Sequence, residues 1–258
     1  MAFNEDSRVK IPAILHLIRL GFTYVPQGEQ HRRESTNIFE AIFSQSILKL
    51  NPNLEESDAK RILDEITLEL DFEDLGEKFY HRLTSGSGVK LIDFQNFANN
   101  SFHVTTELTC KNGDEEFRPD ITLLINGMPL AFIEVKKPHN REGVVDERNR
   151  INKRFKQKHF RRFANITQLM VFSNNMEYED GIVDPVFGAF YATAAYKDLQ
   201  FNYFREDPEY PVKQGLKTIS EEQENAILKD TNLMVIKHSP EFLTNKSEYT
   251  PTHRILTS

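Results

Sequence analysis

Residues 118–138 read RPDITLLINGMPLAFIEVKKP, and this stretch decides the fold of the 258-residue chain. Two runs rich in apolar and β-branched residues, 121–125 and 130–135, flank an Asn-Gly pair, which is the strongest short signal for a β-hairpin. Upstream, apolar and polar residues alternate over 104–110, as is typical of a half-buried strand, and a second Asn-Gly pair at 112–113 predicts a turn. The sequence therefore predicts three consecutive antiparallel strands.

Helical periodicity precedes these strands. Apolar residues recur every three or four positions through most of the first eighty residues, which is the spacing of one helix face. Asn53, followed three residues later by Glu56, resembles a capping box, so one helix is expected to begin there. The predicted helices span 11–22, about 36–50, and 53–70.

After the hairpin the pattern changes again. A segment rich in Lys and Arg, with apolar residues on one side, predicts a helix over about 146–163, and a short apolar run predicts a buried strand over 169–172. The stretch 186–196 fits either a strand or a helix. Farther on the chain is polar, with a helix expected over 220–229 and a loop-like tail over 239–258.

The order helix, three strands, helix and strand (αβββαβ) predicts an α/β fold in which a mixed β-sheet is flanked by helices. We assign residues 1–205 to one domain, with a helical N-terminal part at 1–85 and the core at 100–200. Residues 206–258 are expected to form a linker or C-terminal extension.

The overall charge hides a local asymmetry. The chain has 32 Lys and Arg against 39 Asp and Glu, and this net charge of −7 argues against a nucleic-acid binder that relies on overall basicity. From Lys136 to Arg162, however, eleven basic residues outnumber three acidic ones, so this stretch carries +8 and the rest of the chain −15. Such a block is often only a solvated helix face.

Cys110 is the single cysteine, so the chain can form neither an internal disulfide nor a Cys-rich zinc site. No apolar run approaches the roughly 20 residues that span a bilayer, and the first residues lack the apolar core of a signal peptide. We therefore expect a reduced, cytoplasmic protein that does not enter a membrane.

Two acids and a lysine lie on the second and third predicted strands. Side chains alternate along a strand, so Glu134 and Lys136 project from one face about 7 Å apart. Carboxylate oxygens hold Mg²⁺ where phosphodiesters are hydrolysed, so we expect Asp120 and Glu134 to be metal ligands, with the Val135 carbonyl as a third. Lys136 would orient or help deprotonate the attacking water and neutralise developing charge.

The same residues have a simpler interpretation, because charged residues make up 28% of the chain and chance matches are common. A surface ion pair on a half-exposed sheet would contribute little to stability. Glu134, however, lies inside the most apolar strand, where a lone carboxylate is costly unless it is paired or bound to a metal. This placement favours the functional interpretation.

The strand register tests this interpretation. A plain two-residue loop at Asn126-Gly127 would set Asp120 opposite Ile133, on the face away from Glu134. A three-residue loop or a β-bulge would instead set Asp120 opposite Glu134. We therefore predict an irregularity between these two acids.

At these residues the sequence resembles a known family. The block 118–138 is similar to the PD-(D/E)xK nuclease core found in the N-terminal region of the restriction (R) subunit of type I restriction-modification enzymes. The stretches 79–89, 167–174 and 251–258 also resemble that subunit. The resemblance implies a restriction-endonuclease-like core that cuts double-stranded DNA with Mg²⁺. It places Asp120, Glu134 and Lys136 on the catalytic triplet.

The resemblance also implies partners, namely the methyltransferase and specificity subunits of a type I complex. ATP would be used only by the motor domains of the full R subunit, and a Gly-x-x-x-x-Gly-Lys-Ser/Thr loop does not occur in this sequence. We expect the chain to be an N-terminal fragment, with 206–258 leading towards that motor. The family's Gln-x-x-x-Tyr motif is missing from 149–155, where Phe155 would stand in place of the Tyr.

The basic segment follows the Glu134-Lys136 strand directly. We expect Ile151 and Phe155 to pack on the sheet while the cations contact the DNA backbone. Alternatively, some cations pair with the acidic helices of the first eighty residues or dock the motor. The predicted DNA-binding residues are Lys137, Arg150, Arg154 and Lys158.

Two rival functions remain open. The same fold could be a non-catalytic module that binds DNA or docks other subunits, with the acidic residues forming an ion network. It could also be a repair nuclease of the same superfamily that acts on DNA ends.

Overall fold

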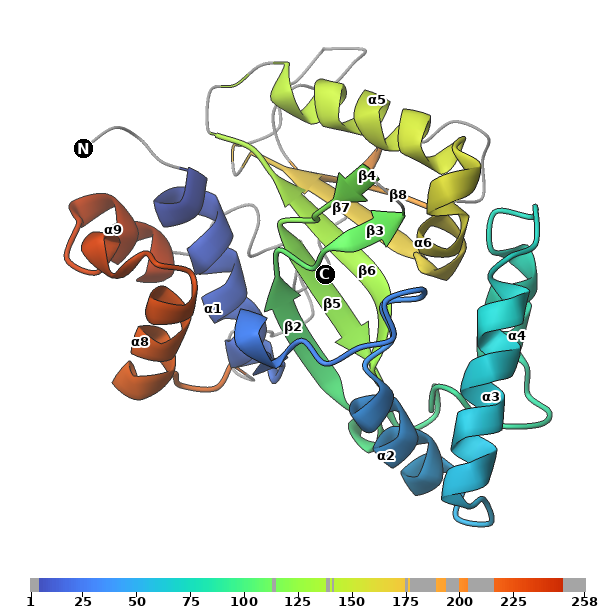
Figure 1. Cartoon of the computed structure of the whole chain (residues 1–258). Helices are drawn as coiled ribbons and strands as arrows, with labels where there is room; N and C mark the ends of the chain where they lie inside the picture. Colours follow the sequence, from blue (N-terminus) through green and yellow to red (C-terminus); the bar gives the residue numbers. More distant parts are fainter. Residues whose placement is uncertain are drawn as a thin grey trace.

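The computed structural model describes residues 5–112, 115–137, 140, 142–174, 176, 189–193, 200–203 and 216–247. Within them, a seven-stranded mixed sheet forms the centre and helices surround it (Figure 1). This architecture confirms the predicted α/β fold. In order across the sheet the strands are β1 (Thr23–Tyr24), β2 (Phe102–Thr106), β5 (Ile121–Ile125), β6 (Met128–Val135), β7 (Leu169–Ser173), β8 (Ala189–Ala192) and β9 (Asn202–Tyr203).

The centre of the sheet is the predicted antiparallel meander of β2, β5 and β6. β1 joins one side of this meander in parallel with β2, and β7 joins the other side in parallel with β6. β8 and β9 continue the sheet in antiparallel pairing. The segment 186–196, which fitted a strand or a helix, therefore contains a strand at Ala189–Ala192, and its remaining positions lie largely outside the described residues.

The β5–β6 turn is built as its sequence predicts. Asn126 and Gly127 both have positive φ, 51° and 80°, which suits a turn whose twist matches the paired strands. A Cβ on Gly127 would lie 2.6 Å from the backbone nitrogen of Phe43 and 2.8 Å from the carbonyl oxygen of Phe39. Only glycine therefore fits where the hairpin meets the helix that follows Phe39.

The predicted irregularity is present in the β5–β6 ladder. Next to the turn, Ile125 pairs with Met128 as a two-residue loop requires, but the register shifts by one residue between Leu123 and Leu124. Beyond the shift, Ile121 pairs with Ile133. This register places Asp120 level with Glu134 and confirms the predicted bulge.

The helical N-terminal part is confirmed, with small differences at the helix ends. The second helix begins four positions later than predicted because residues 33–38 form a turn closed by an Arg33–Ile38 bridge. The third helix is capped by Glu55 and Asp58, whose carboxylate accepts the Glu55 N–H, so the predicted Asn53-Glu56 box is wrong. The helices are α1 (Ile11–Leu20), preceded by a π-helical turn, and α2 (Glu40–Leu50), α3 (Glu56–Glu69) and α4 (Glu77–Thr84).

Two predicted elements are broken in the structure. The predicted strand over 104–110 ends at Thr106 because Glu107 has a φ of 51°, and the chain then enters a separate hairpin of β3 (Cys110–Asn112) and β4 (Glu115–Phe117). The predicted basic helix ends early, since α5 (Gly143–Phe155) is followed by a 3₁₀ turn at Lys158–Phe160 and by α6 (Arg161–Ile166).

Helices cover both faces of the sheet (Figure 1). On one face α1 packs against Ile121, Ile133 and Val135. On the other face α5 and its neighbours pack against Phe132 and Phe172. Helices α2, α3 and α4 form a third apolar cluster around the β5–β6 turn. The meander is therefore held from three directions, and Val135 and Glu134 point to opposite faces.

The C-terminal segment adds two helices to the α1 face. α8 (Glu221–Asp230) confirms the predicted helix, whereas α9 (Pro240–Ser247) corrects the loop-like tail expected from residue 239. Phe242 of α9 is fully buried in the α1 cluster, and apolar packing accounts for the ordered helix. The Asp230 carboxylate accepts the Tyr24 hydroxyl at 2.6 Å, which ties α8 to β1.

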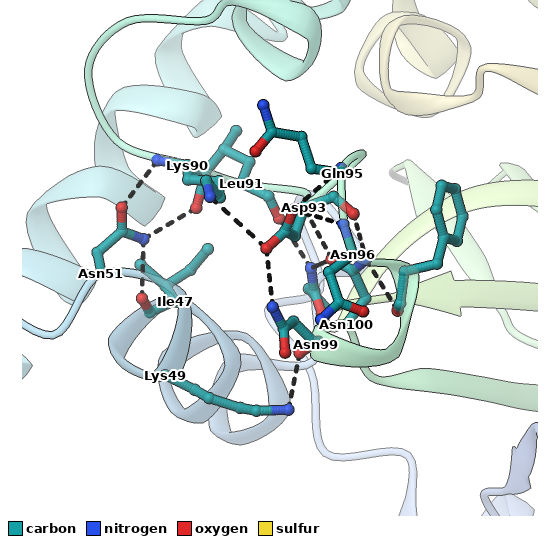
Figure 2. A network of polar contacts seen from close by, with 12 residues as sticks. Ile47, Lys49, Asn51, Lys90, Leu91, Asp93, Gln95, Asn96, Asn99 and Asn100 are labelled. Carbon is teal, nitrogen blue, oxygen red and sulfur yellow. Dashed lines mark hydrogen bonds and ion pairs between the residues drawn. The ribbon is translucent and has the colours of Figure 1, made fainter.

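A polar network joins the chain segment that leads into β2 to the end of α2, where the Asn51 side chain donates to the Lys90 carbonyl (Figure 2). The same segment is also bonded to the β5–β6 turn. The Asn126 side chain donates to the Leu91 carbonyl at 2.8 Å and to Asn100 Oδ1 at 2.9 Å. Asp93 in turn accepts hydrogen bonds from the Asn99 side chain and from the backbone N–H of Asn96. These bonds lower the pKa of Asp93 to about 2.

We predict that Asp93→Asn lowers the thermal unfolding midpoint by several degrees at pH 7. Because the pKa of Asp93 is lower in the folded chain than in the unfolded one, its contribution is present above about pH 4 and is lost as the pH falls through about 2. The difference in unfolding midpoint between the wild type and Asp93→Asn should therefore become smaller between pH 4 and pH 2. Thermal melts at several pH values, with the exposed Glu56→Gln as a control, measure this. An advantage that does not change with pH would contradict it.

Candidate active site

The three residues of the predicted triplet lie together at one end of the β5–β6 pair. The Val135 N–H donates to Asp120 Oδ2 with an N···O distance of 2.9 Å. The Asp120 carboxyl group is also close enough to Glu134 to raise the pKa of Glu134. Because the N–H and C=O of one strand residue point towards the same neighbour, the Val135 carbonyl also faces the Asp120 side. The bulge thus brings Asp120 next to the Glu134–Val135 backbone.

Glu134 is a buried carboxyl group that lacks full pairing. The residue is 4% exposed, and its Oε1 atom has no hydrogen-bond partner among the described residues. Burial raises the pKa of Glu134 well above its usual range, and the neighbouring Asp120 raises it further, while Lys136 acts in the opposite direction. A buried acceptor without a partner destabilises the folded state unless a cation binds to it.

These residues fit a divalent cation such as Mg²⁺. Hard cations of this kind prefer carboxylate and carbonyl oxygens, which Asp120, Glu134 and Val135 provide. Glu134 Oε1 has no hydrogen-bond partner among the described residues and is therefore available to a cation. In the part of the chain that the structure describes, no group of three or more His, Cys, Asp and Glu side chains is arranged to hold a metal. A bound ion would therefore depend on the main-chain carbonyl and on water or substrate oxygens.

Lys136 lies between two carboxylates. Its Nζ atom is 3.6 Å from Glu134 Oε2 and 3.4 Å from Glu147 Oε2. Burial lowers the pKa of Lys136, but the charges of Glu134, Glu147 and Asp120 outweigh this effect and leave the pKa raised. The side chain is thus a fixed ammonium group beside the acid pair.

Sequence reasoning missed Glu147 on α5. This residue is 4% exposed and receives ion pairs from Arg150 at 3.1 Å and from Arg154 at 3.3 Å, besides Lys136. A signal was present: Glu147 lies three residues after Val144 and four before Ile151, so it shares their buried helix face. A charged residue inside an apolar stripe indicates a buried partner.

Sequence reasoning also missed the residues that reach the site from the N-terminus. Lys10, which precedes α1, is buried, pairs with Glu107, and has its Nζ atom 3.8 Å from Asp120 Oδ1. Burial raises the pKa of Glu5, and the charges of Lys136 and Asp120 also act on it. More than one hundred residues separate this segment from Asp120, so no local pattern could have linked them.

The four predicted DNA-binding residues fall in three places. The side chain of Arg150 is 63% exposed on α5, and that of Arg154 is 26% exposed and lies over the Phe117 ring, 4.1 Å from its centroid. Lys137 is exposed where β6 ends. Lys158 is not on the same helix and instead lines a hollow of about 850 Å³ beside α6.

Two further arginines of the basic segment, Arg161 and Arg162, form ion pairs with the N-terminal helical part. Arg162 makes two 2.7 Å contacts with the Asp71 carboxylate, and Arg161 pairs with Glu73. Both acids follow α3 in the N-terminal helical part. For these two arginines the structure confirms the alternative in which cations pair with the acidic helices of the first eighty residues.

Over the described residues, no helix is both long and apolar enough to cross a membrane.

Comparison with known proteins places the chain in a family. It matches the family described as "Type I restriction enzyme R protein N terminus" over residues 2–180, and it belongs to this family. This finding confirms the resemblance read from the 118–138 block.

Individual relatives agree with the family. The chain is 29% identical over 202 residues to the "Putative type I restriction enzyme MjaIXP endonuclease subunit" of Methanocaldococcus jannaschii, covering 69% of this chain and 19% of the relative. It is 28% identical over 163 residues to the type I restriction enzyme HindI endonuclease subunit of Haemophilus influenzae, covering 57% and 15%. The chain thus spans less than a fifth of the length of these relatives.

The burial of Glu134 leads to a prediction about stability. Because the pKa of Glu134 is higher in the folded chain than in the unfolded one, this residue destabilises the folded state increasingly as the pH rises above about 4.5. In metal-free buffer at pH 8, Glu134→Gln should therefore raise the free energy of unfolding, by about 1 kcal/mol or more. Chemical denaturation measures this change.

Glu65→Gln is the matched control for this measurement. Glu65 pairs with Arg82, and this hydrogen bond lowers the pKa of its carboxyl group, so the control should be neutral or destabilising. A loss of stability in Glu134→Gln as large as that in a core truncation would show that Glu134 is held by structural pairing alone.

Proposed function

We propose that this chain is the nuclease domain of a type I restriction enzyme R subunit and hydrolyses phosphodiester bonds in double-stranded DNA with Mg²⁺. One observation carries the proposal: a bulge brings Asp120 level with Glu134, beside the fixed ammonium group of Lys136. Two acids and a lysine on one face of a strand pair are what metal-dependent hydrolysis of a phosphodiester requires. Family membership supports the same function.

Each residue has a distinct role in this proposal. Asp120, Glu134 and the Val135 carbonyl would hold Mg²⁺, which supplies a Lewis acid that stabilises charge on the phosphate oxygens. The buried environment of Glu134 keeps water from competing for its oxygens. Lys136 stays protonated, orients the attacking water, and neutralises negative charge as it develops at the phosphate.

The cations on and before α5 extend the site towards the DNA backbone. Lys137 is exposed and follows Lys136 directly in the sequence. Arg150 is exposed and contacts Glu147, which in turn contacts Lys136. Contacts of this kind position a duplex without reading its sequence. Arg154 and Lys158 are proposed as weaker contributors, because the Arg154 side chain lies over the Phe117 ring and pairs with Glu147, and Lys158 lies beyond the end of α5.

Sequence recognition and movement along DNA would belong to other parts of the enzyme. The relatives are named as endonuclease subunits of type I restriction enzymes, and the aligned regions cover only 19% and 15% of their lengths. We propose that this chain acts in the cytoplasm within such an assembly, with methyltransferase and specificity subunits, and that ATP is used only by motor domains outside this sequence.

We predict that Asp120→Ala and Lys136→Ala each abolish plasmid cleavage in the assembled enzyme, with a loss of at least about 100-fold. Glu73→Gln and Lys60→Ala, which change exposed residues of the N-terminal helical part, are the matched controls and should cut at the wild-type rate. The measurement is the rate of plasmid cleavage over a titration of Mg²⁺. If both active-site variants still cut, the acid cluster is the ion network of a non-catalytic DNA-binding module.

Arg150 gives a prediction about DNA binding. Arg150→Glu should weaken binding to duplex DNA and flatten the dependence of log K on log salt by about 1 for each phosphate that the side chain no longer neutralises. Arg61→Glu, a charge reversal at an exposed position on α3, is the control and should leave the slope unchanged. Binding measured at several salt concentrations decides the matter, and an unchanged slope for Arg150→Glu would reject the assignment.

A further inference from the structure

Glu147 belongs to the charged cluster around Lys136 but has no role in the proposed chemistry. Its two oxygens contact three cations: Oε2 lies 3.4 Å from Lys136 Nζ and 3.1 Å from Arg150 Nη1, and Oε1 lies 3.3 Å from Arg154 Nη1. The carboxylate itself is buried. A buried carboxylate in contact with three cations is strongly held, and removing it would leave those cations without their shared counter-charge.

The geometry at Lys136 shows what this arrangement does to the acid pair. The ammonium group lies slightly closer to Glu147 than to Glu134, at 3.4 Å against 3.6 Å, and neither distance is that of a short hydrogen bond. Glu134 Oε1, although buried, has no hydrogen-bond partner among the described residues. Glu147 therefore shares the ammonium group with Glu134, so that Lys136 does not pair with Glu134 alone.

The same carboxylate forms ion pairs with two arginines of α5. Arg154 is held between Glu147 and the Phe117 ring of β4, which fixes its position. Arg150, on the next turn, is mostly exposed but also contacts Glu147. One buried negative charge is thus shared between the active-site lysine and two arginines of the helix that we place near DNA.

We propose that Glu147 is a positioning residue that holds Lys136 away from the Asp120–Glu134 pair and, through the same carboxylate, restrains Arg150 and Arg154 on α5. This inference rests on the proposed nuclease function. It assigns Glu147 a role in the arrangement of Lys136 and in the balance of charge on α5, without contact to the substrate.

The test measures DNA cleavage and duplex binding, and the inference predicts that Glu147→Gln weakens the first and strengthens the second. In Glu147→Gln the ammonium group moves towards Glu134, so the cleavage rate constant at saturating DNA and Mg²⁺ should fall at least about tenfold. Arg154, which Glu147 and Phe117 hold in the wild type, loses its counter-charge and becomes free to contact phosphate, while Arg150 keeps the contact proposed above. Duplex binding in the assembled enzyme should therefore tighten, and the dependence of log K on log salt should steepen by about 1. A variant that was merely damaged would lose both cleavage and binding.

Two further variants complete the experiment. Glu147→Asp keeps the charge but shortens the side chain, so DNA binding should return to the wild-type salt slope while cleavage stays reduced, and this variant serves if Glu147→Gln does not fold. Glu69→Gln removes a partly buried carboxylate that pairs with Arg82 on α4 at 2.8 Å, and it should change neither measurement.

The outcomes separate the inference from the proposed function. If Glu147→Gln cuts and binds like the wild type while Asp120→Ala is inactive, Glu147 is not a positioning residue and the nuclease assignment stands. If Glu147→Gln and Glu147→Asp lose cleavage and DNA binding together, Glu147 is only structural. If Asp120→Ala still cuts, the proposed function itself fails.

Discussion

One hydrogen bond, from the Val135 N–H to Asp120 Oδ2, joins the strand register to the arrangement of the acids. It forms because the ladder shifts by one residue between Leu123 and Leu124; without the shift, Asp120 would lie on the opposite face of the sheet. The turn from which the register is counted cannot slip, since Gly127 is wedged against α2 and Asn126 is bonded to the segment before β2. Packing at one end of the hairpin thus determines the position of Asp120 relative to Glu134 at the other end.

The site is built from groups that do not favour burial. Glu134 is buried next to a second carboxyl group, and the pair is tolerated because Lys136, Lys10 and the arginines around Glu147 surround it with positive charge. Such clusters contribute little to net stability, and the three apolar clusters around the meander supply the stability instead. The basic segment of this acidic chain lies on α5, α6 and the turn between them, so its cations are concentrated on the side of the sheet that α5 covers.

The sequence predicted the meander, its turn and the bulge that brings Asp120 level with Glu134, because each depends on neighbours in the chain or on a chemical requirement that excludes the other register. It did not predict the strand end at Glu107, the division of the basic helix after Phe155, or the ordered helix α9, since tertiary packing decides each of them. Glu147 could have been found from its place on the buried face of α5. Lys10 and Glu5 could not, because only the fold brings the segment before α1 to Asp120.

A crystal structure of the protein grown with Mn²⁺ would test the proposal that Asp120, Glu134 and the Val135 carbonyl form a single cation site. Mn²⁺ takes the same oxygen ligands as Mg²⁺ and gives an anomalous signal. We expect one strong anomalous peak within direct coordination distance of both carboxylates and of that carbonyl oxygen, with Lys136 still beside Glu147. A peak elsewhere, or full-occupancy density in which Asp120 and Glu134 lie on opposite faces of the sheet, would contradict it.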